Sequence, residues 1–189
     1  VKAALIATHI AEIDVAQAAE FLTSAYLQFN LTAKDLLPTL DSLNTLSNNY
    51  KVTTKDLLDS ISRTGEVYAE HNGTLEELAA VTAVVSQVTS RTGTQIGNAI
   101  KTIQSNLDRP ETRKMLFEEL GVQSHDAAGE AKSFGRMLIE LRTRMLGVSD
   151  AEQKQIQLGV SNIRQRSILA SATSNVANIM VAENKALME

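Results

Sequence analysis

The sequence contains Thr32-Ala33-Lys34-Asp35-Leu36-Leu37 and, further on, the nearly identical Thr53-Thr54-Lys55-Asp56-Leu57-Leu58. A third segment, Thr74-Leu75-Glu76-Glu77-Leu78, has the same form, and the three Thr residues are evenly spaced. In each segment the Thr hydroxyl can accept the backbone N–H three residues on, where an acid also suits the positive end of a helix dipole. The third segment can in addition close a capping box. We therefore predict three helix starts, each leading into a helix of about four turns.

The even spacing has two interpretations. A solenoid repeat would continue the period along the chain, but the period ends after Thr74 and differs from the common helical-repeat lengths. The alternative, which we favour, is a run of helices of similar length that fold back on one another.

Apolar residues recur at steps of three and four, which is the helical period and not that of strands. We therefore predict an all-α fold: a multi-helix bundle of antiparallel helices with a longer, thinly apolar C-terminal helical segment. The stripes expected to face the core are Ala19, Leu22, Tyr26 and Phe29; Leu40, Leu43 and Leu46; Leu78, Val81, Val85 and Val88; Ile96, Ile100, Ile103 and Leu107; and Phe134, Leu138, Leu141 and Met145.

Further helix boundaries are marked in the second half of the chain. Asp108-Arg109-Pro110-Glu111 offers an Asp cap and an early Pro, and Gly121 stands where a helix would end. Ser149-Asp150-Ala151-Glu152 predicts a capping box before a long polar helix.

Residues 149–189 are rich in Gln, Asn, Ser and Ala, and their apolar stripe is thin. A thin stripe buries little area per turn, so such helices often need a partner. We expect self-association here, with a trimer as one arrangement. We divide the chain into a helical core domain, 1–148, and a C-terminal helical segment, 149–189. The chain begins at Val1 without Met or a signal-peptide pattern, and it stops within a helical pattern, so we also expect a longer parent chain. The thin apolar stripe of residues 149–189 consists of Ile156, Val160, Ile163, Val176 and Met180.

Composition excludes several function classes. The formal net charge is −4, so the chain lacks the basic surplus that drives nucleic-acid binding. There is no Cys, which excludes disulfides, thiolate catalysis and Cys-based metal sites. No apolar run approaches the ~20 residues that span a bilayer.

Each residue type that could carry chemistry has a simpler structural interpretation. His9, His71 and His125 lie far apart and lack metal-ligand spacing. The adjacent acids of the two Glu pairs point about 100° apart on a helix, which fits a solvated face better than acid–base catalysis. The Glu pairs are Glu76/Glu77 and Glu118/Glu119.

The glycines and arginines also favour structural roles. Gly93-Thr94-Gln95-Ile96-Gly97 lacks the strand and the Lys-Ser/Thr pair of a phosphate loop, so we expect a tight turn and then a Gly that lets two helices approach closely. The arginines have two interpretations, a contact with nucleic acid or pairing with local acids such as Glu140, and we favour the local pairing. We therefore predict that the chain is not an enzyme, with no catalytic, cofactor-binding or metal-ligating residues and no small-molecule ligand. The arginines are Arg136, Arg142, Arg144, Arg164 and Arg166.

An ordered series of motifs covers about residues 30–170. It includes Leu40-Asp41-Ser42-Leu43, the Thr53–Leu58 start, Gly73-Thr74-Leu75-Glu76-Glu77-Leu78-Ala79-Ala80, Gly93-Thr94-Gln95-Ile96-Gly97-Asn98-Ala99-Ile100-Lys101, Leu107-Asp108-Arg109-Pro110, Leu116–Leu120 with Gly121-Val122, the Leu138/Leu141 helix and Ser149-Asp150-Ala151-Glu152-Gln153. In this order and at these separations, the motifs resemble the core region of phage tail tape measure proteins.

The resemblance implies a much longer, mostly helical protein inside the tail tube of the virion. Such a protein sets tail length, helps tail-tube subunits polymerise and leaves during DNA ejection. Its implied partners are tail tube and tail assembly or tip proteins, and its implied locations are the virion tail and, during assembly, the host cytoplasm.

A second hypothesis is a membrane-active or secreted helical effector, such as a translocator. The run from Leu78 to Val88 favours it, although Thr82, Ser86 and Gln87 interrupt that run and it is too short to span a membrane.

Overall fold

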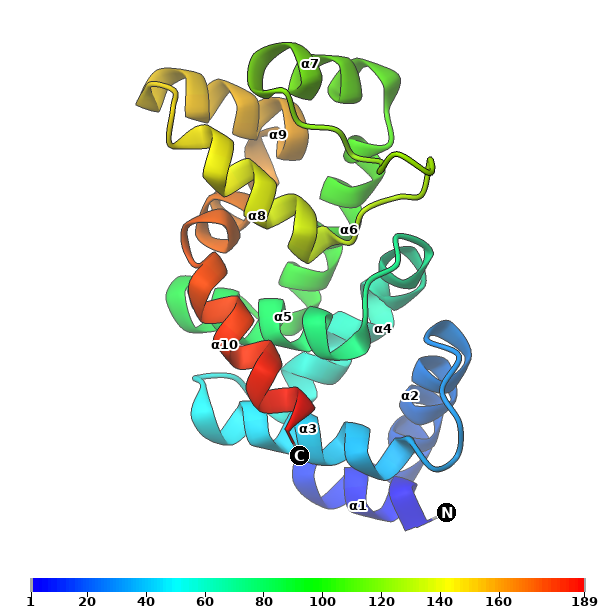
Figure 1. Cartoon of the computed structure of the whole chain (residues 1–189). Helices are drawn as coiled ribbons and strands as arrows, with labels where there is room; N and C mark the ends of the chain where they lie inside the picture. Colours follow the sequence, from blue (N-terminus) through cyan, green and yellow to red (C-terminus); the bar gives the residue numbers. More distant parts are fainter. Residues whose placement is uncertain (1, 189) are drawn as a thin grey trace.

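The computed structural model describes residues 2–188, and within this range the chain forms ten α-helices and no strand (Figure 1). The predicted all-α class is therefore confirmed. The helices are α1 (Lys2–Ala11), α2 (Val15–Gln28), α3 (Leu36–Asn49), α4 (Thr54–Glu70), α5 (Leu75–Thr89), α6 (Gly93–Leu107), α7 (Pro110–Leu120), α8 (Phe134–Met145), α9 (Asp150–Ser174) and α10 (Val176–Leu187).

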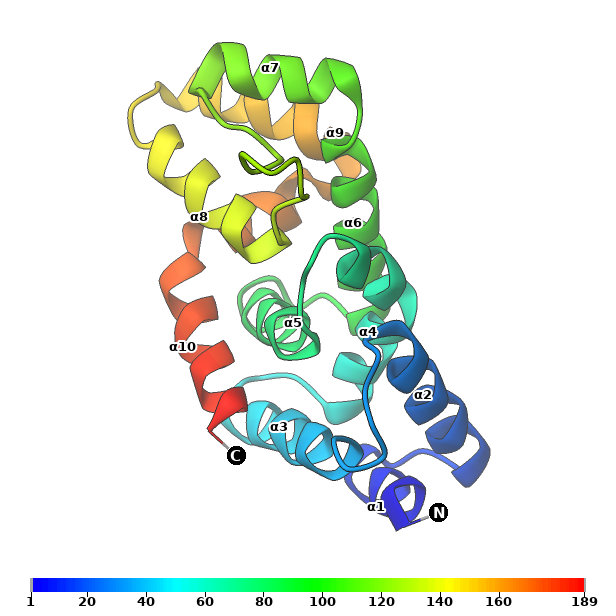
Figure 2. The ribbon, with the colours of Figure 1, turned by 45° about the vertical axis from the view of Figure 1, so that its right-hand side comes forward.

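The molecule is elongated, and α5 lies in its middle. Figure 2 views α5 nearly along its axis, with α3, α4, α6, α8 and α10 around it. Helices α1 to α3 form one end and α7, with the first part of α9, forms the other (Figure 1). The last helix, α10, returns along α5 towards α3, where the Ser42 hydroxyl donates a 2.6 Å hydrogen bond to the Ala186 carbonyl.

Helix α5 is buried on all sides. Leu75 and every residue from Glu77 to Ser86 are buried, and Val88 becomes half-exposed only as the helix leaves the core. Ala and Val fill this helix, and a helix that is apolar all round belongs inside a protein core or a membrane. Here the Leu78–Val88 run lies largely inside the protein. Within residues 2–188, none of the helices has the length and apolar character needed to cross a membrane.

Two glycines set the distance between α4 and α6. A Cβ atom on Gly97 would lie 2.8 Å from the carbonyl oxygen of Ser60, and one on Gly93 would lie 1.7 Å from that of Asp56. The Gly93 N–H also donates to the Asp56 carboxylate at 2.9 Å. The predicted close approach of two helices is therefore confirmed, although Gly93 is already the first helical residue and not part of a turn.

Two of the three predicted Thr-led starts are confirmed. Thr53 accepts the Asp56 N–H and Thr74 accepts the Glu77 N–H. The start at Thr32 is wrong, because α3 begins only at Leu36. Pro38 explains the delay: it has no N–H, so it fits the first turn of a helix but not a position two turns in. Thr32 instead donates its N–H and hydroxyl to the Asp35 carboxylate.

The stripes of α3, α6 and α8 are buried as predicted, whereas that of α2 is displaced. Its buried residues are Ala18, Phe21, Leu22 and Ala25, whereas Ala19 is exposed and Tyr26 is 43% exposed. The displacement brings the large Phe21 ring into the core and leaves the Tyr26 ring partly in solvent, where its hydroxyl needs no buried partner.

Helix α9 bends sharply at Asn162, whose backbone (φ 58°, ψ 178°) is not helical. The Asn162 side chain accepts the Arg164 N–H at 3.1 Å, and Asn106 of α6 donates to the Val160 carbonyl at 3.0 Å. These bonds replace helical ones that the bend removes. Ile156 and Val160 are buried as predicted, but Ile163 is 82% exposed because the bend turns it away from their stripe.

Substituting Gly97 tests the contact between α4 and α6. We expect Gly97→Ala to lower the free energy of unfolding by about 1–3 kcal/mol, because the added methyl meets backbone that cannot move without displacing a helix. Urea unfolding measures this change. Gly147→Ala is the matched control, since its Cβ would lie at an ordinary 3.5 Å from its nearest neighbour. Equal stability of the two variants would contradict this role.

Candidate interaction surfaces

The three histidines lie apart in the fold. His9 is exposed on α1, and the His125 ring lies 3.0 Å from the Ser124 hydroxyl between α7 and α8. Among residues 2–188, no three His, Asp or Glu side chains are grouped so that they could hold a metal ion. The histidine with the most defined surroundings is His71, at the end of α4.

His71 joins the ends of α4 and α6. Its Nδ1 lies 2.7 Å from the Val67 carbonyl, and its Nε2 lies 2.9 and 3.0 Å from the two Asp108 carboxylate oxygens. The carbonyl and carboxylate oxygens can only accept hydrogen bonds, so each ring nitrogen must donate one. Only the protonated ring carries a hydrogen on both nitrogens. Burial opposes that charge, but the hydrogen bonds to Asp108 and Val67 outweigh it and raise the pKa of His71 above 6.5.

This contact corrects the prediction that Asp108 caps α7. Asp108 follows α6, and its carboxylate binds His71, so α7 starts after Arg109 without a side-chain cap. Pro110 occupies the first turn of α7 and Gly121 ends it in a left-handed conformation (φ 66°), both as predicted.

Glu77 also departs from its prediction. Glu118 and Glu119 are exposed, but Glu77 is only 8% exposed and does not belong to a solvated face. Its Oε1 accepts the buried Tyr68 hydroxyl at 2.8 Å and the Gly135 N–H at 2.5 Å. The carboxylate therefore ties α4, α5 and α8 together. It also turns away from Thr74, so the expected capping box is not closed, whereas that of Ser149 and Glu152 is.

An open pocket of about 280 Å³, the α8–α10 pocket, lies beside this network where α5, α8 and α10 meet. Burial, and then the charges of Glu77 and Glu76, raise the pKa of Glu183 on α10. The pocket therefore joins two acids to an apolar lining. Its walls include Glu77 and Glu183 and the apolar side chains of Leu138, Ile139, Ile179 and Met180.

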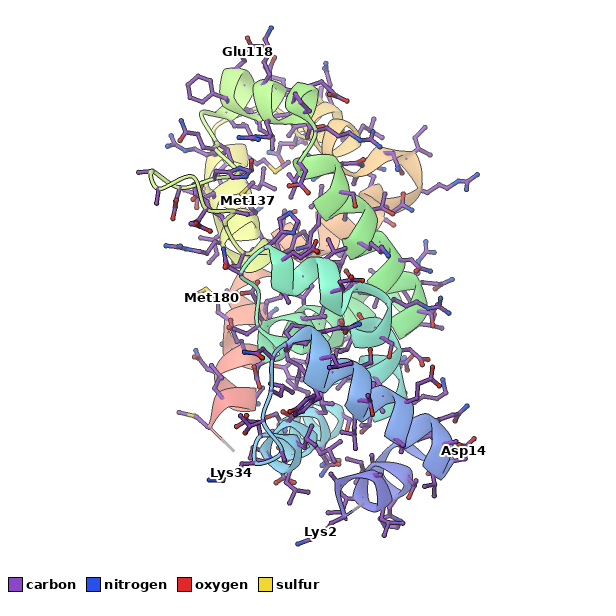
Figure 3. The ribbon with its side chains drawn as sticks, turned by 90° about the vertical axis from the view of Figure 1, so that its right-hand side faces the viewer. Lys2, Asp14, Lys34, Glu118, Met137 and Met180 are labelled. Carbon is purple, nitrogen blue, oxygen red and sulfur yellow. The ribbon has the colours of Figure 1, made fainter. Side chains whose placement is uncertain are left out.

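The second half of the chain also presents apolar side chains of α10 and the exposed side chains of Arg136, Arg142, Arg144 and Arg164 to solvent. Met180 is 48% exposed and Val181 53% exposed on α10, where Ile179 takes the buried position expected for Met180. Figure 3 shows Met180 on the outer side of that helix.

Glu140 pairs with Lys132 at 2.7 Å and not with an arginine, so the expected pairing is wrong for this acid.

Comparison with known proteins gives one family. The sequence model of the family described as phage-related minor tail protein matches residues 1–159. A tape measure protein of Pneumococcus phage Dp-1 is 24% identical over 144 residues, which is 75% of this chain and 12% of that protein. The chain therefore spans about an eighth of the length of this relative. No solved structure matches. The resemblance to tape measure proteins is confirmed.

The His71–Asp108 pair predicts a specific pH dependence. Because folding raises the pKa of His71, the pair contributes its full stability below pH 6.5 and loses it as the pH rises through the raised pKa. We expect the stability difference between the wild type and His71→Gln to shrink over that range in urea unfolding. His9→Gln, on the exposed face of α1, is the control. A difference independent of pH would show that the charge of His71 contributes nothing.

Proposed function

Because the chain belongs to the phage-related minor tail protein family, we propose that it is a folded part of a tail tape measure protein. A structural role in a phage tail follows from the family itself. The finer proposal is that the whole protein lies in the tail tube, templates tube polymerisation, sets tail length and leaves on DNA ejection. It would meet its tube and tip partners in the host cytoplasm during assembly.

The observation that carries this proposal is the match over residues 1–159, together with the similarity to a tape measure protein. The fold is compatible with it, since the helices of residues 2–188 are joined by frequent turns and pack around α5, so that they do not form one extended rod. We therefore assign length measurement to other helical parts of the protein, and interactions to this one. Within the chain, we propose that residues 1–148 form a helical core domain and residues 149–189 a C-terminal helical segment.

Deletions in the parent gene test the ruler function. An extended helix rises about 1.5 Å per residue, so in-frame deletions in its helical parts should shorten the tail in proportion to the residues removed. Electron microscopy of the virions measures tail length. Replacing the same part by an equally long helical sequence is the control and should keep the length. Assembled tails of unchanged length after a deletion would contradict the ruler function.

We further propose that the chain self-associates as a trimer through the apolar residues of its last two helices. Ile163 is the most exposed of these within α9, so burying it against a second copy removes apolar surface from water. Sedimentation equilibrium should give a mass about three times 20.5 kDa that falls towards the monomer in Ile163→Gln. Leu27→Gln, at a 70% exposed position of α2, should leave the mass unchanged. A monomer at high concentration would rule out self-association.

A further inference from the structure

The α8–α10 pocket holds two acids, Glu77 and Glu183, that form no ion pair with a basic side chain among residues 2–188. The ion pairs found among residues 2–188 are Lys55–Asp59, His71–Asp108, Lys114–Glu118 and Lys132–Glu140, and neither pocket acid takes part in them. Arg136 lies at the pocket but is exposed to solvent and is absent from these pairs. The negative charge of the pocket is therefore available to a ligand.

Glu77 is held in place by the fold. Tyr68 and Gly135 both donate to its Oε1, and each comes from a different helix. No hydrogen bond found among residues 2–188 uses its second oxygen, Oε2, although the side chain is buried and lines the pocket. Gly135 lies in the first turn of α8, where the helix dipole favours negative charge. Glu77 is thus a preorganised acceptor with a free oxygen.

Glu183 supplies the second acid from α10. Its pKa is raised first by burial and then by the charges of Glu77 and Glu76, which means that these acids repel one another. A cation bound between Glu183 and Glu77 would remove that repulsion.

The rest of the pocket is apolar. Leu138 and Ile179 are buried in its floor, and Ile139 and Met180 are 39% and 48% exposed at its rim. Met180 carries a flexible and polarizable side chain that adapts to different neighbours. Such walls suit a ligand with a hydrocarbon stem. A divalent metal ion would instead require a shell of six or more oxygen atoms.

We propose that the α8–α10 pocket binds an arginine side chain of another protein chain, with the guanidinium group between Glu77 and Glu183 and the methylene stem against Ile139 and Met180. Charge complementarity selects a basic residue. Arg fits better than Lys, because its planar fork matches carboxylates and is more weakly hydrated. Its methylenes cover apolar surface while the charged end reaches the acids. This binding chemistry does not depend on the tape measure function.

Small probes test the pocket in the 189-residue chain. Methyl NMR of Met180 and Ile139 would follow titrations with butylguanidinium, with guanidinium and with 1-butanol. We expect saturable shifts with butylguanidinium at lower concentration than with either of the other two, because only butylguanidinium combines charge and stem. Equal binding of guanidinium would show a charge effect only, and equal binding of butanol an apolar cavity only. Either result, or no saturation at all, would overturn the proposal.

Variants assign the binding to the two acids. Glu183→Gln should weaken butylguanidinium binding about fivefold, the size expected for one partly exposed charge pair. Glu119→Gln, an exposed acid on α7, should leave binding unchanged. Glu183 is preferred to Glu77 for this test, because Glu77 also holds Tyr68 and Gly135 in the fold. Arg136 carries the same positive charge as butylguanidinium, so Arg136→Gln should preserve or tighten the binding of butylguanidinium. Unchanged affinity in Glu183→Gln would contradict the proposed site.

Discussion

The burial of α5 on every side is the constraint that organises the molecule. A single helix can be surrounded only if several others pack against it, and α3, α4, α6, α9 and α10 all do so. The small and β-branched side chains of α5 allow these neighbours to approach closely. Its one buried carboxylate must also be satisfied inside the protein, since a buried charge without partners is costly. Glu77 meets this requirement through Tyr68 and Gly135, and so it links the centre of the fold to the α8–α10 pocket.

Local sequence rules predicted the structure correctly for residues that cap their own helix and for apolar residues that face the core. The capping residues Thr53, Thr74 and Ser149 begin their helices as predicted, and the apolar stripes of α3, α6 and α8 face the core. The Gly97 prediction was also confirmed, because a glycine inside a helix has few roles besides close packing. The start at Thr32 failed although Pro38 was visible in the sequence and would have corrected it.

The residues whose roles were predicted wrongly form hydrogen bonds with residues that are distant in the sequence. Asp108 has the sequence of a helix cap but binds His71, which lies 37 positions away. Glu77 has the spacing of a capping box, yet its carboxylate binds Gly135 from α8, 58 positions away. In both cases a tertiary hydrogen bond replaced the local one that the sequence suggested. The α8–α10 pocket could not have been predicted for the same reason, since its acids come from α5 and α10.

The bend at Asn162 shows how a favourable local pattern can be overruled by packing elsewhere. Ile156, Val160 and Ile163 would share one face of a straight helix, and the bend moves Ile163 into solvent. The Asn162 backbone lies in a region that costs about 1–3 kcal/mol for a residue with a side chain. Two features offset this cost: Asn106 binds the carbonyl that the bend frees, and the new direction leads through buried Ile168, Leu169 and Ala172 to α10, which packs along α5. Together with the break at Asn175, the bend therefore gives the chain the direction in which α10 packs along α5 and places Glu183 in the same pocket as Glu77.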